Sequence, residues 1–183
     1  MKLYAVRHGE TDLNIDDRFQ GASNASLNTR GRLQAYDLVL RLPNDAVQVV
    51  SSPLRRALET AEMVAGERRL PLSRMPEFRE RSFGVFEGLT AVEAEELYPE
   101  LICRNILQKW DDAPPGAETI REVSSRVSLG IAKLRSLDVG GAVILLTHGF
   151  VIRILQHFLQ DIPEQDIFAL RRIGNGDFIQ FVL

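Results

Sequence analysis

Two apolar segments of this chain end in the same short pattern, in which a histidine precedes a glycine. Leu3 to Val6 leads into Arg7-His8-Gly9, and Ala142 to Leu146 leads into Thr147-His148-Gly149. Each segment has the length and composition of a buried strand, and the glycine allows a sharp turn beyond it. Because ligands of open α/β sheets bind beyond the carboxyl ends of the strands, we expect both histidines to face one site.

Hydrophobic periodicity predicts helices and strands that alternate along the rest of the chain. The predicted elements are a helix through Leu33 to Leu40, a strand from Val47 to Val50, a helix through Leu54 to Ala65, a short strand from Leu70 to Met75, a helix from Thr90, a helix through Ile120 to Leu134 and a helix through Val151 to Phe158. This alternation indicates an α/β fold, a three-layer α/β/α sandwich with a mainly parallel sheet and an antiparallel edge strand. Because the sequence contains no repeat and no linker, we expect residues 1–183 to form a single domain.

Capping and turn residues predict several boundaries of these elements. Ser52-Pro53 has the residue types of an N-cap and a first helical position, and Gly66 suits the end of that helix. Thr90 and Glu93 have the spacing of a capping box. Gly174-Asn175-Gly176 lies between two apolar runs, which predicts a β-hairpin.

Composition favours a soluble globular protein that binds neither nucleic acid nor membranes. Of the 183 residues, 45 % are apolar and 26 % are charged, and the net charge of −3 comes without a long basic run. Cys103 is the only cysteine, so no disulfide can form within the chain, and we expect it to be packed in a helical segment. The apolar run at Leu3 is too short for a signal peptide, and no segment approaches membrane-spanning length, so the expected location is the cytoplasm.

Four sequence blocks carry a resemblance to a known family. They are Leu3 to Asn14, Ser51 to Ala61, Arg79 to Gly88 and Thr147 to Gly149. In content and in order they resemble the signature of the histidine phosphatase, or phosphoglycerate mutase-like, superfamily. The resemblance implies a phosphoglycerate mutase-like fold and a phosphoryl-transfer site that needs no cofactor and no metal.

The resemblance also implies a role for individual residues. It makes His8 the nucleophile that attacks phosphorus, and Glu80 the general acid that protonates the leaving alcohol. Arg7, Arg56 and His148 correspond to the family's phosphate clamp, a role that suits arginine because its planar guanidinium binds phosphate oxygens in pairs. Helical periodicity alone does not decide whether Arg55 or Arg56 belongs to the clamp, and we choose Arg56 because of its position in the family motif.

A further group of residues is expected to contact the phosphate. Asn14 matches the family's amide donor, and Gln20 and Gly21 lie where that family's loop offers phosphate contacts. Gly149 is added because a glycine after the second strand lets the backbone approach a ligand closely. Glu118 lies near a position where the family often has a glutamate at the pocket edge, and we leave it out of the core assignment.

Other phosphate-handling sites are excluded by their missing motifs. The sequence has no Gly-x4-Gly-Lys-Ser/Thr loop, no Gly-x-Ser-x-Gly elbow and no Asp-x-Asp pair. Cys103 lacks the preceding histidine and the following arginine of a cysteine phosphatase loop. Asp12-x-Asn14-x-Asp16 starts like a calcium loop, but Asp17 and Ser23 occupy the positions that need glycine and glutamate.

Three functions agree with these residues, and the first is the prediction. It is a metal-independent phosphatase of small phosphomonoesters, because the segment from Gly88 to Thr147 is shorter than in the cofactor-dependent phosphoglycerate mutases. Within the phosphatases, Phe83 to Glu87 and Trp110 resemble the α-ribazole phosphatase branch of cobalamin synthesis, although broad-specificity sugar-phosphate phosphatases share most of these features. A phosphoglycerate mutase and a catalytically silent binding protein remain as alternatives, and a homodimer is left open.

Overall fold

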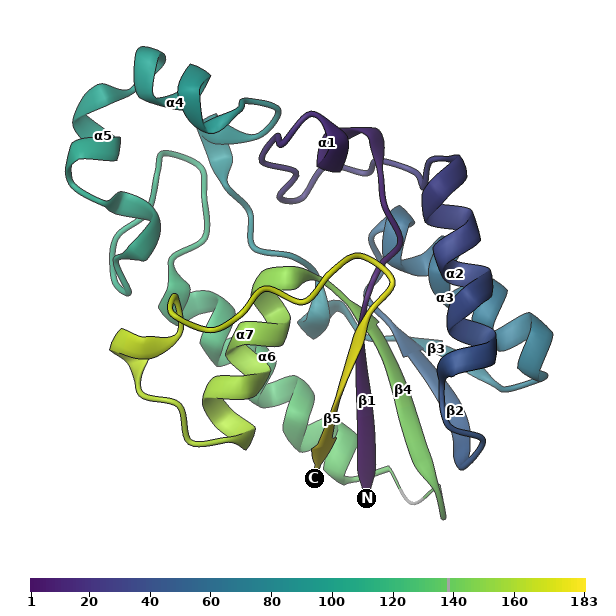
Figure 1. Cartoon of the computed structure of the whole chain (residues 1–183). Helices are drawn as coiled ribbons and strands as arrows, with labels where there is room; N and C mark the ends of the chain where they lie inside the picture. Colours follow the sequence, from purple (N-terminus) through teal and green to yellow (C-terminus); the bar gives the residue numbers. More distant parts are fainter. Residues whose placement is uncertain (138) are drawn as a thin grey trace.

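A five-stranded sheet lies between two layers of helices in the computed structural model (Figure 1), which describes residues 1–137 and 139–183. The strands are β1 Lys2–Arg7, β2 Ala46–Ser51, β3 Leu72–Arg74, β4 Ala142–Thr147 and β5 Phe178–Val182. Their order is β3-β2-β4-β1-β5, with parallel pairing throughout except between β1 and the antiparallel edge strand β5. This architecture confirms the predicted fold class.

Seven α-helices and four short 3-10 helices accompany the sheet in the described part of the chain. The α-helices are α1 Asp12–Ile15, α2 Thr29–Arg41, α3 Arg55–Arg68, α4 Ala91–Leu97, α5 Pro99–Cys103, α6 Ile120–Arg135 and α7 Gly149–Leu159. The 3-10 helices are η1 Pro76–Phe78, η2 Gly84–Phe86, η3 Ile106–Gln108 and η4 Glu164–Asp166. None of the described helices is long and apolar enough to cross a membrane.

Side-chain alternation along the strands divides the interior into two cores. In β4, Val143 and Leu145 face the core that α6 and α7 cover, whereas Ile144 and Leu146 face the core under α2 and α3. Successive strand residues point to opposite faces, so a strand covered on both faces must be apolar throughout. This explains why all six residues of β4 are buried.

A third apolar cluster lies beyond one end of the sheet. Phe86, Ala94 and Ile106 form its buried centre, from the segment that contains α4 and α5. In Figure 1 this segment stands clear of the sheet, on the side where β1 and β4 end. It provides one wall above the carboxyl ends of the strands.

The start and the end of α3 differ from the prediction. The helix begins at Arg55 behind Leu54, so the predicted N-cap at Ser52 was wrong. The Ser52 hydroxyl accepts from the N–H of Leu54 at 3.3 Å and also lies 2.7 Å from Nε2 of His148. The predicted stop at Gly66 was also wrong. Arg69 takes the left-handed conformation with φ of 54°, and its N–H bonds back to the helix, so Gly66 stays inside α3.

The turn at residues 174–176 does not close a hairpin. The chain before it forms no strand, and only β5 follows it. The turn packs against the end of β1 instead, because the Gly176 N–H donates to the carbonyl of Arg7 at 3.1 Å. The hairpin prediction was therefore wrong, although the antiparallel edge strand was right.

Two expectations about side-chain burial also fail. The periodic residues Leu33, Tyr36 and Leu40 do form part of a helix, but they are 67, 54 and 74 % exposed. Glycines determine which face of α2 packs against the protein. The backbones of Gly9 and Gly31 approach so closely that a Cβ on Gly9 would lie 2.3 Å from the carbonyl oxygen of Gly31 in that helix. Cys103 is exposed at the end of α5 and is not packed.

Candidate active site

A cavity of about 330 Å³ opens beyond the carboxyl ends of β1 and β4. The strands pair in parallel with Val6 opposite Leu146 and Arg7 opposite Thr147. The residues that follow these pairs therefore come together, and the rings of His8 and His148 lie 5.2 Å apart. His8 lines the cavity, whereas His148 lies next to it, fully buried, and is not among the lining residues, so its part in the site stays a prediction.

His8 is buried with both ring nitrogens engaged. Its Nδ1 lies 2.7 Å from the carbonyl oxygen of Gly9, and Nε of Arg56 donates to its Nε2 at 3.2 Å. A carbonyl only accepts and a guanidinium only donates, so Nδ1 carries the proton and Nε2 carries the lone pair. Burial, and then the charges of Arg56 and Arg7, hold the pKa of His8 well below 6.5. The ring is therefore neutral at physiological pH.

His148 lies behind His8 and is fully buried. Its Nε2 is 2.7 Å from the hydroxyl of Ser52, while its Nδ1 has no partner among the described residues. Burial, followed by the charge of Arg56, lowers the pKa of His148 well below 6.5. The sequence missed Ser52 as its partner, because a serine before proline has the more common interpretation of a helix cap.

Arg56 and Arg7 bring positive charge to the floor of the cavity. Arg56 is 1 % exposed, and its two Nη atoms donate to the carbonyls of Ser23 and Gly21 at 2.7 and 2.8 Å. Burial lowers the pKa of Arg56 to about 10, so the guanidinium stays charged. Nη1 of Arg7 donates to the carbonyl of Ile173 at 2.8 Å. Figure 1 shows why this contact exists, since the chain before β5 passes over the end of β1.

Asn14 is oriented by its neighbours. Its Oδ1 accepts from the N–H of Thr11 at 3.1 Å and from Nδ2 of Asn175 at 3.2 Å. Asn175 also donates to the carbonyl of His8 at 3.0 Å. With its oxygen held in this way, Asn14 lines the cavity with its NH₂ group as the remaining donor.

The other predicted phosphate contacts also line the cavity. Gln20 is 7 % exposed, and its Oε1 has no partner within residues 1–137 and 139–183. Gly21 has a φ of 52°, and a Cβ there would lie 2.0 Å from Oε1 of Glu87. Gly149 begins α7, so the positive end of that helix faces the cavity.

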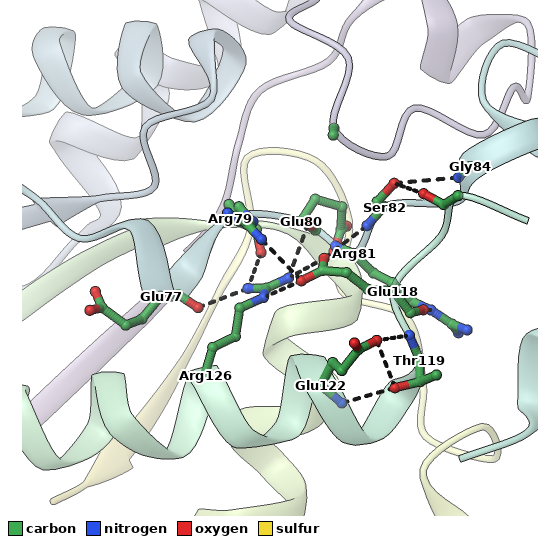
Figure 2. A network of polar contacts seen from close by, with 12 residues as sticks. Glu77, Arg79, Glu80, Arg81, Ser82, Gly84, Glu118, Thr119, Glu122 and Arg126 are labelled. Carbon is green, nitrogen blue, oxygen red and sulfur yellow. Dashed lines mark hydrogen bonds and ion pairs between the residues drawn. The ribbon is translucent and has the colours of Figure 1, made fainter. Parts of the chain in front are cut away.

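Glu80 sits on a loop whose backbone is held from below by α6 (Figure 2). Its Oε1 accepts from the N–H of Arg81 at 3.0 Å and its Oε2 from the N–H of Phe150 at 3.3 Å. Arg126 of α6 donates to the carbonyls of Arg79 and Glu80 at 2.6 and 3.1 Å. The sequence did not reveal Arg126, whose hydrogen bond to the carbonyl of Glu80 spans 46 residues of the chain.

Glu118 helps to hold the loop that carries Glu80, and it does not line the cavity. Its carboxylate accepts from Nε and Nη2 of Arg126 at 2.9 and 3.0 Å and from the N–H of Ser82 at 3.1 Å (Figure 2). Burial raises the pKa of Glu118, but the hydrogen bond and charge of Arg126 outweigh burial and hold it below its usual value. Glu118 therefore belongs to the support of the loop.

Unpaired buried polar atoms gather around the cavity. In the part of the chain that the structure describes, seven buried side-chain polar atoms lack a partner; three belong to the cavity-lining residues Arg7, Gln20 and Arg81, and a fourth to His148 behind His8. Buried polar groups are normally hydrogen-bonded, so such a concentration indicates a site that a polar ligand completes. No group of three His, Cys, Asp or Glu in the described chain is arranged to hold a metal ion.

Comparison with known proteins decides the family. The model of the histidine phosphatase superfamily (branch 1) matches residues 3–181. The chain belongs to this superfamily.

Several relatives of this histidine phosphatase are themselves phosphatases. The phosphatase PhoE of Bacillus subtilis strain 168 is 33 % identical over 151 residues, 82 % of this chain and 72 % of the relative. A solved mycobacterial glucosyl-3-phosphoglycerate phosphatase has a TM-score of 0.88 and 29 % identity, over 98 % of this chain and 90 % of that one. The α-ribazole phosphatase of Shigella flexneri has a TM-score of 0.88 and 27 % identity, over 98 and 89 %. The expected phosphoglycerate mutase-like fold and phosphatase class are confirmed.

Proposed function

We propose that this histidine phosphatase hydrolyses small phosphomonoesters without a metal, through a phosphohistidine on Nε2 of His8. The observation that carries the proposal is the tautomer of His8, whose lone pair on Nε2 faces the arginines of the cavity. A neutral imidazole with its other nitrogen already hydrogen-bonded is an activated nucleophile. Phosphoryl transfer otherwise needs mainly positioning and positive charge, which Arg7 and Arg56 supply.

In the first step His8 replaces the alcohol on phosphorus. The N–H of Arg56 that now occupies the lone pair turns to a phosphate oxygen, which frees Nε2. Nε2 forms the P–N bond, the P–O bond to the alcohol breaks, and Glu80, which enters this step as the protonated acid, delivers its proton to the departing oxygen. Arg7, Arg56, the unpaired Nδ1 of His148 and the NH₂ group of Asn14 hold the three remaining oxygens.

In the second step water takes the place of the alcohol. Glu80, now a carboxylate, accepts a proton from the water, whose oxygen attacks phosphorus on the side that the alcohol left. The P–N bond breaks, inorganic phosphate leaves, and His8 recovers its lone pair. The N–H groups of Arg81 and Phe150 fix the position of the Glu80 carboxyl group at the cavity wall for both steps.

The proposal also concerns which phosphate ester is the physiological substrate. A cavity of about 330 Å³ fits a small molecule, in line with the lower end of ligand sites in proteins. Sugar phosphates and α-ribazole phosphate both remain candidates; the relatives of similar structure named above are a glucosyl-3-phosphoglycerate phosphatase and an α-ribazole phosphatase. Because the family members named above are phosphatases, we place hydrolysis ahead of mutase activity and of silent binding.

The test is hydrolysis of p-nitrophenyl phosphate in EDTA by three proteins. The unsubstituted chain should release phosphate, and His8→Ala should lose at least about a thousandfold in rate, as expected when a nucleophile is removed. His157→Ala is the matched control, because His157 lies outside the cavity lining and should leave the rate intact. Acid-quenched enzyme should contain an acid-labile phosphohistidine that His8→Ala lacks. Normal turnover by His8→Ala, or turnover only with added metal, would contradict the proposal.

A further inference from the structure

Ser52 and His148 meet because the strands before them pair in the sheet. β2 and β4 run in parallel with Ser51 opposite Leu146, so Ser52 begins the chain beyond β2 beside the place where His148 follows β4. The Ser52 backbone is held there, since its N–H donates to the carbonyl of Leu146 at 2.9 Å. Both residues are fully buried, and the Ser52 hydroxyl lies 2.7 Å from Nε2 of His148. The contact is therefore set by the register of the sheet.

The Ser52 hydroxyl has a second partner, which decides the direction of its bond to His148. The N–H of Leu54 donates to Oγ of Ser52 at 3.3 Å, so the oxygen already acts as an acceptor. A hydroxyl that accepts from one neighbour can still donate its own proton to another. In the described chain that proton has no acceptor within reach except Nε2 of His148. The Ser52 hydroxyl therefore donates to Nε2, which must carry a lone pair.

The other protonation states of His148 would leave more buried groups unsatisfied. With the proton on Nε2, the Ser52 hydroxyl proton would lose its acceptor, and Nδ1 would present a lone pair that no donor among the described residues reaches. A ring protonated at both nitrogens would strand the hydroxyl proton in the same way. An unpaired polar group is costly in the interior, so the fold favours the tautomer with the proton on Nδ1.

We propose that Ser52 is a positioning residue that fixes the tautomer of His148 with the proton on Nδ1. The donors follow one another from the N–H of Leu54 to the Ser52 hydroxyl and on to Nε2 of His148. The inference rests on the proposed function, in which Nδ1 of His148 holds a phosphate oxygen. It gives the reason why that nitrogen is a donor, because Nδ1 itself has no partner in the described chain to fix its proton.

The tautomer decides whether His148 attracts or repels a phosphate. A proton on Nδ1 offers a hydrogen bond to a phosphate oxygen, whereas a lone pair there would meet a negative charge. The two neighbouring histidines then share one tautomer, since Nδ1 of His8 carries the proton that faces the carbonyl of Gly9. They use it in opposite ways, because His8 attacks with the lone pair on Nε2 and His148 binds with the proton on Nδ1.

The experiment is ¹⁵N NMR of the ligand-free protein labelled at histidine, which separates a protonated ring nitrogen from one with a lone pair. Couplings to the ring carbon-bound protons tell Nδ1 from Nε2. Spectra of His157→Ala and His8→Ala assign the signals of His148, because the chain has only 3 histidines. We expect a protonated Nδ1 and an unprotonated Nε2 at neutral pH. A protonated Nε2 would overturn the proposal.

Variants of Ser52 connect the tautomer to phosphate binding. Ser52→Ala removes the donor, so part of the His148 population should move its proton to Nε2. Vanadate should then bind about 3- to 10-fold more weakly, the equivalent of one neutral hydrogen bond. Ser52→Thr keeps the hydroxyl and should restore both readouts. Ser124→Ala is the matched control and should change neither, because Ser124 is also buried but lies on α6, outside the cavity lining.

The outcomes separate the role of Ser52 from the phosphatase activity. The NMR measurement needs no turnover, so it decides the tautomer of His148 whether or not the chain hydrolyses p-nitrophenyl phosphate. A Ser52→Ala protein whose His148 signals are unchanged would overturn the role of Ser52, even if vanadate bound more weakly, because Ser52 would then only support the fold. A shifted tautomer with unchanged vanadate affinity would also overturn it, since Nδ1 would not hold the phosphate. The unsubstituted chain would remain a phosphatase in both cases.

Discussion

Asn175 links the nucleophile to the phosphate-binding amide. Its single NH₂ group donates to the carbonyl of His8 and to Oδ1 of Asn14, at 3.0 and 3.2 Å. Both acceptors belong to the segment after β1, and Asn175 comes from the turn before β5. The side chain therefore fixes two cavity residues against each other without lining the cavity itself.

We predict that Asn175→Ala lowers kcat/KM for p-nitrophenyl phosphate about 3- to 10-fold, the rate equivalent of one neutral hydrogen bond. The same variant should bind vanadate more weakly, because Asn14 loses part of what orients it. Asn44→Ala is a suitable control, since Asn44 is exposed in the turn before β2. An Asn175→Ala enzyme with unchanged kcat/KM and vanadate affinity would show that the remaining contacts position the site.

Among single residues, the sequence predicted those that lie together in one sequence motif. His8, Arg7 and Asn14 lie in one block, and the structure brings them to one cavity. Asn175 could not be predicted, because Gly174-Asn175-Gly176 is equally typical of a free hairpin turn. Its contact with His8 spans 167 residues of sequence, and only the pairing of β5 with β1 creates it.

At the scale of elements, α6 acts as the support of the loop that carries Glu80. Arg126 points from this helix into the loop, and its hydrogen bonds reach the carbonyls of Glu77, Arg79 and Glu80 (Figure 2). The helix is itself fixed at its start by a capping box of Thr119 and Glu122. The place of Glu80 thus depends on a helix that contributes no residue to the cavity lining.

We predict that Arg126→Gln lowers the free energy of unfolding by about 2 to 4 kcal/mol, because it leaves carbonyls and part of the Glu118 carboxylate without partners. The rate should fall more for an alkyl phosphate than for p-nitrophenyl phosphate, since only the alkyl leaving group needs a well-placed Glu80. Urea unfolding and the two rates measure these effects.

Arg121→Gln is the control on the same helix. Arg121 pairs with Asp111 at 2.6 Å, but its side chain is 50 % exposed, and exposed pairs stabilise proteins little. Equal rate losses for the two leaving groups in Arg126→Gln would show that Arg126 supports the fold without positioning Glu80.

The ends of helices were predictable where a local capping motif was not overridden by contacts with distant parts of the chain. The capping box of Thr90 and Glu93 starts α4 as predicted. Ser52 is not the cap because α3 begins only at Arg55; its hydroxyl accepts from the N–H of Leu54 at 3.3 Å and also lies 2.7 Å from Nε2 of His148, a contact across 96 residues. Helical spacing found α2, but close backbone contact at Gly31 decided which of its faces is buried.

At the scale of the whole molecule, burial of two neutral histidines makes stability depend on pH. Burial holds the pKa of His8 and of His148 well below 6.5, whereas in the unfolded chain both titrate near 6.5. Below that pH the unfolded chain binds protons that the folded chain does not. The free energy of unfolding therefore decreases as the pH falls from neutral, and it is fully regained above pH 6.5.

We predict that the free energy of unfolding in urea drops by about 2 to 3 kcal/mol between about pH 7 and about pH 5.5, which is the linkage expected for two such histidines. A variant that carries His8→Asn and His148→Asn should lose most of this dependence, because neither asparagine titrates. His157→Ala should keep it, since His157 is neither fully buried nor part of the cavity. If the double variant showed the same decrease as the unsubstituted chain, the protons would be binding elsewhere, and His8 would not be held neutral by the fold.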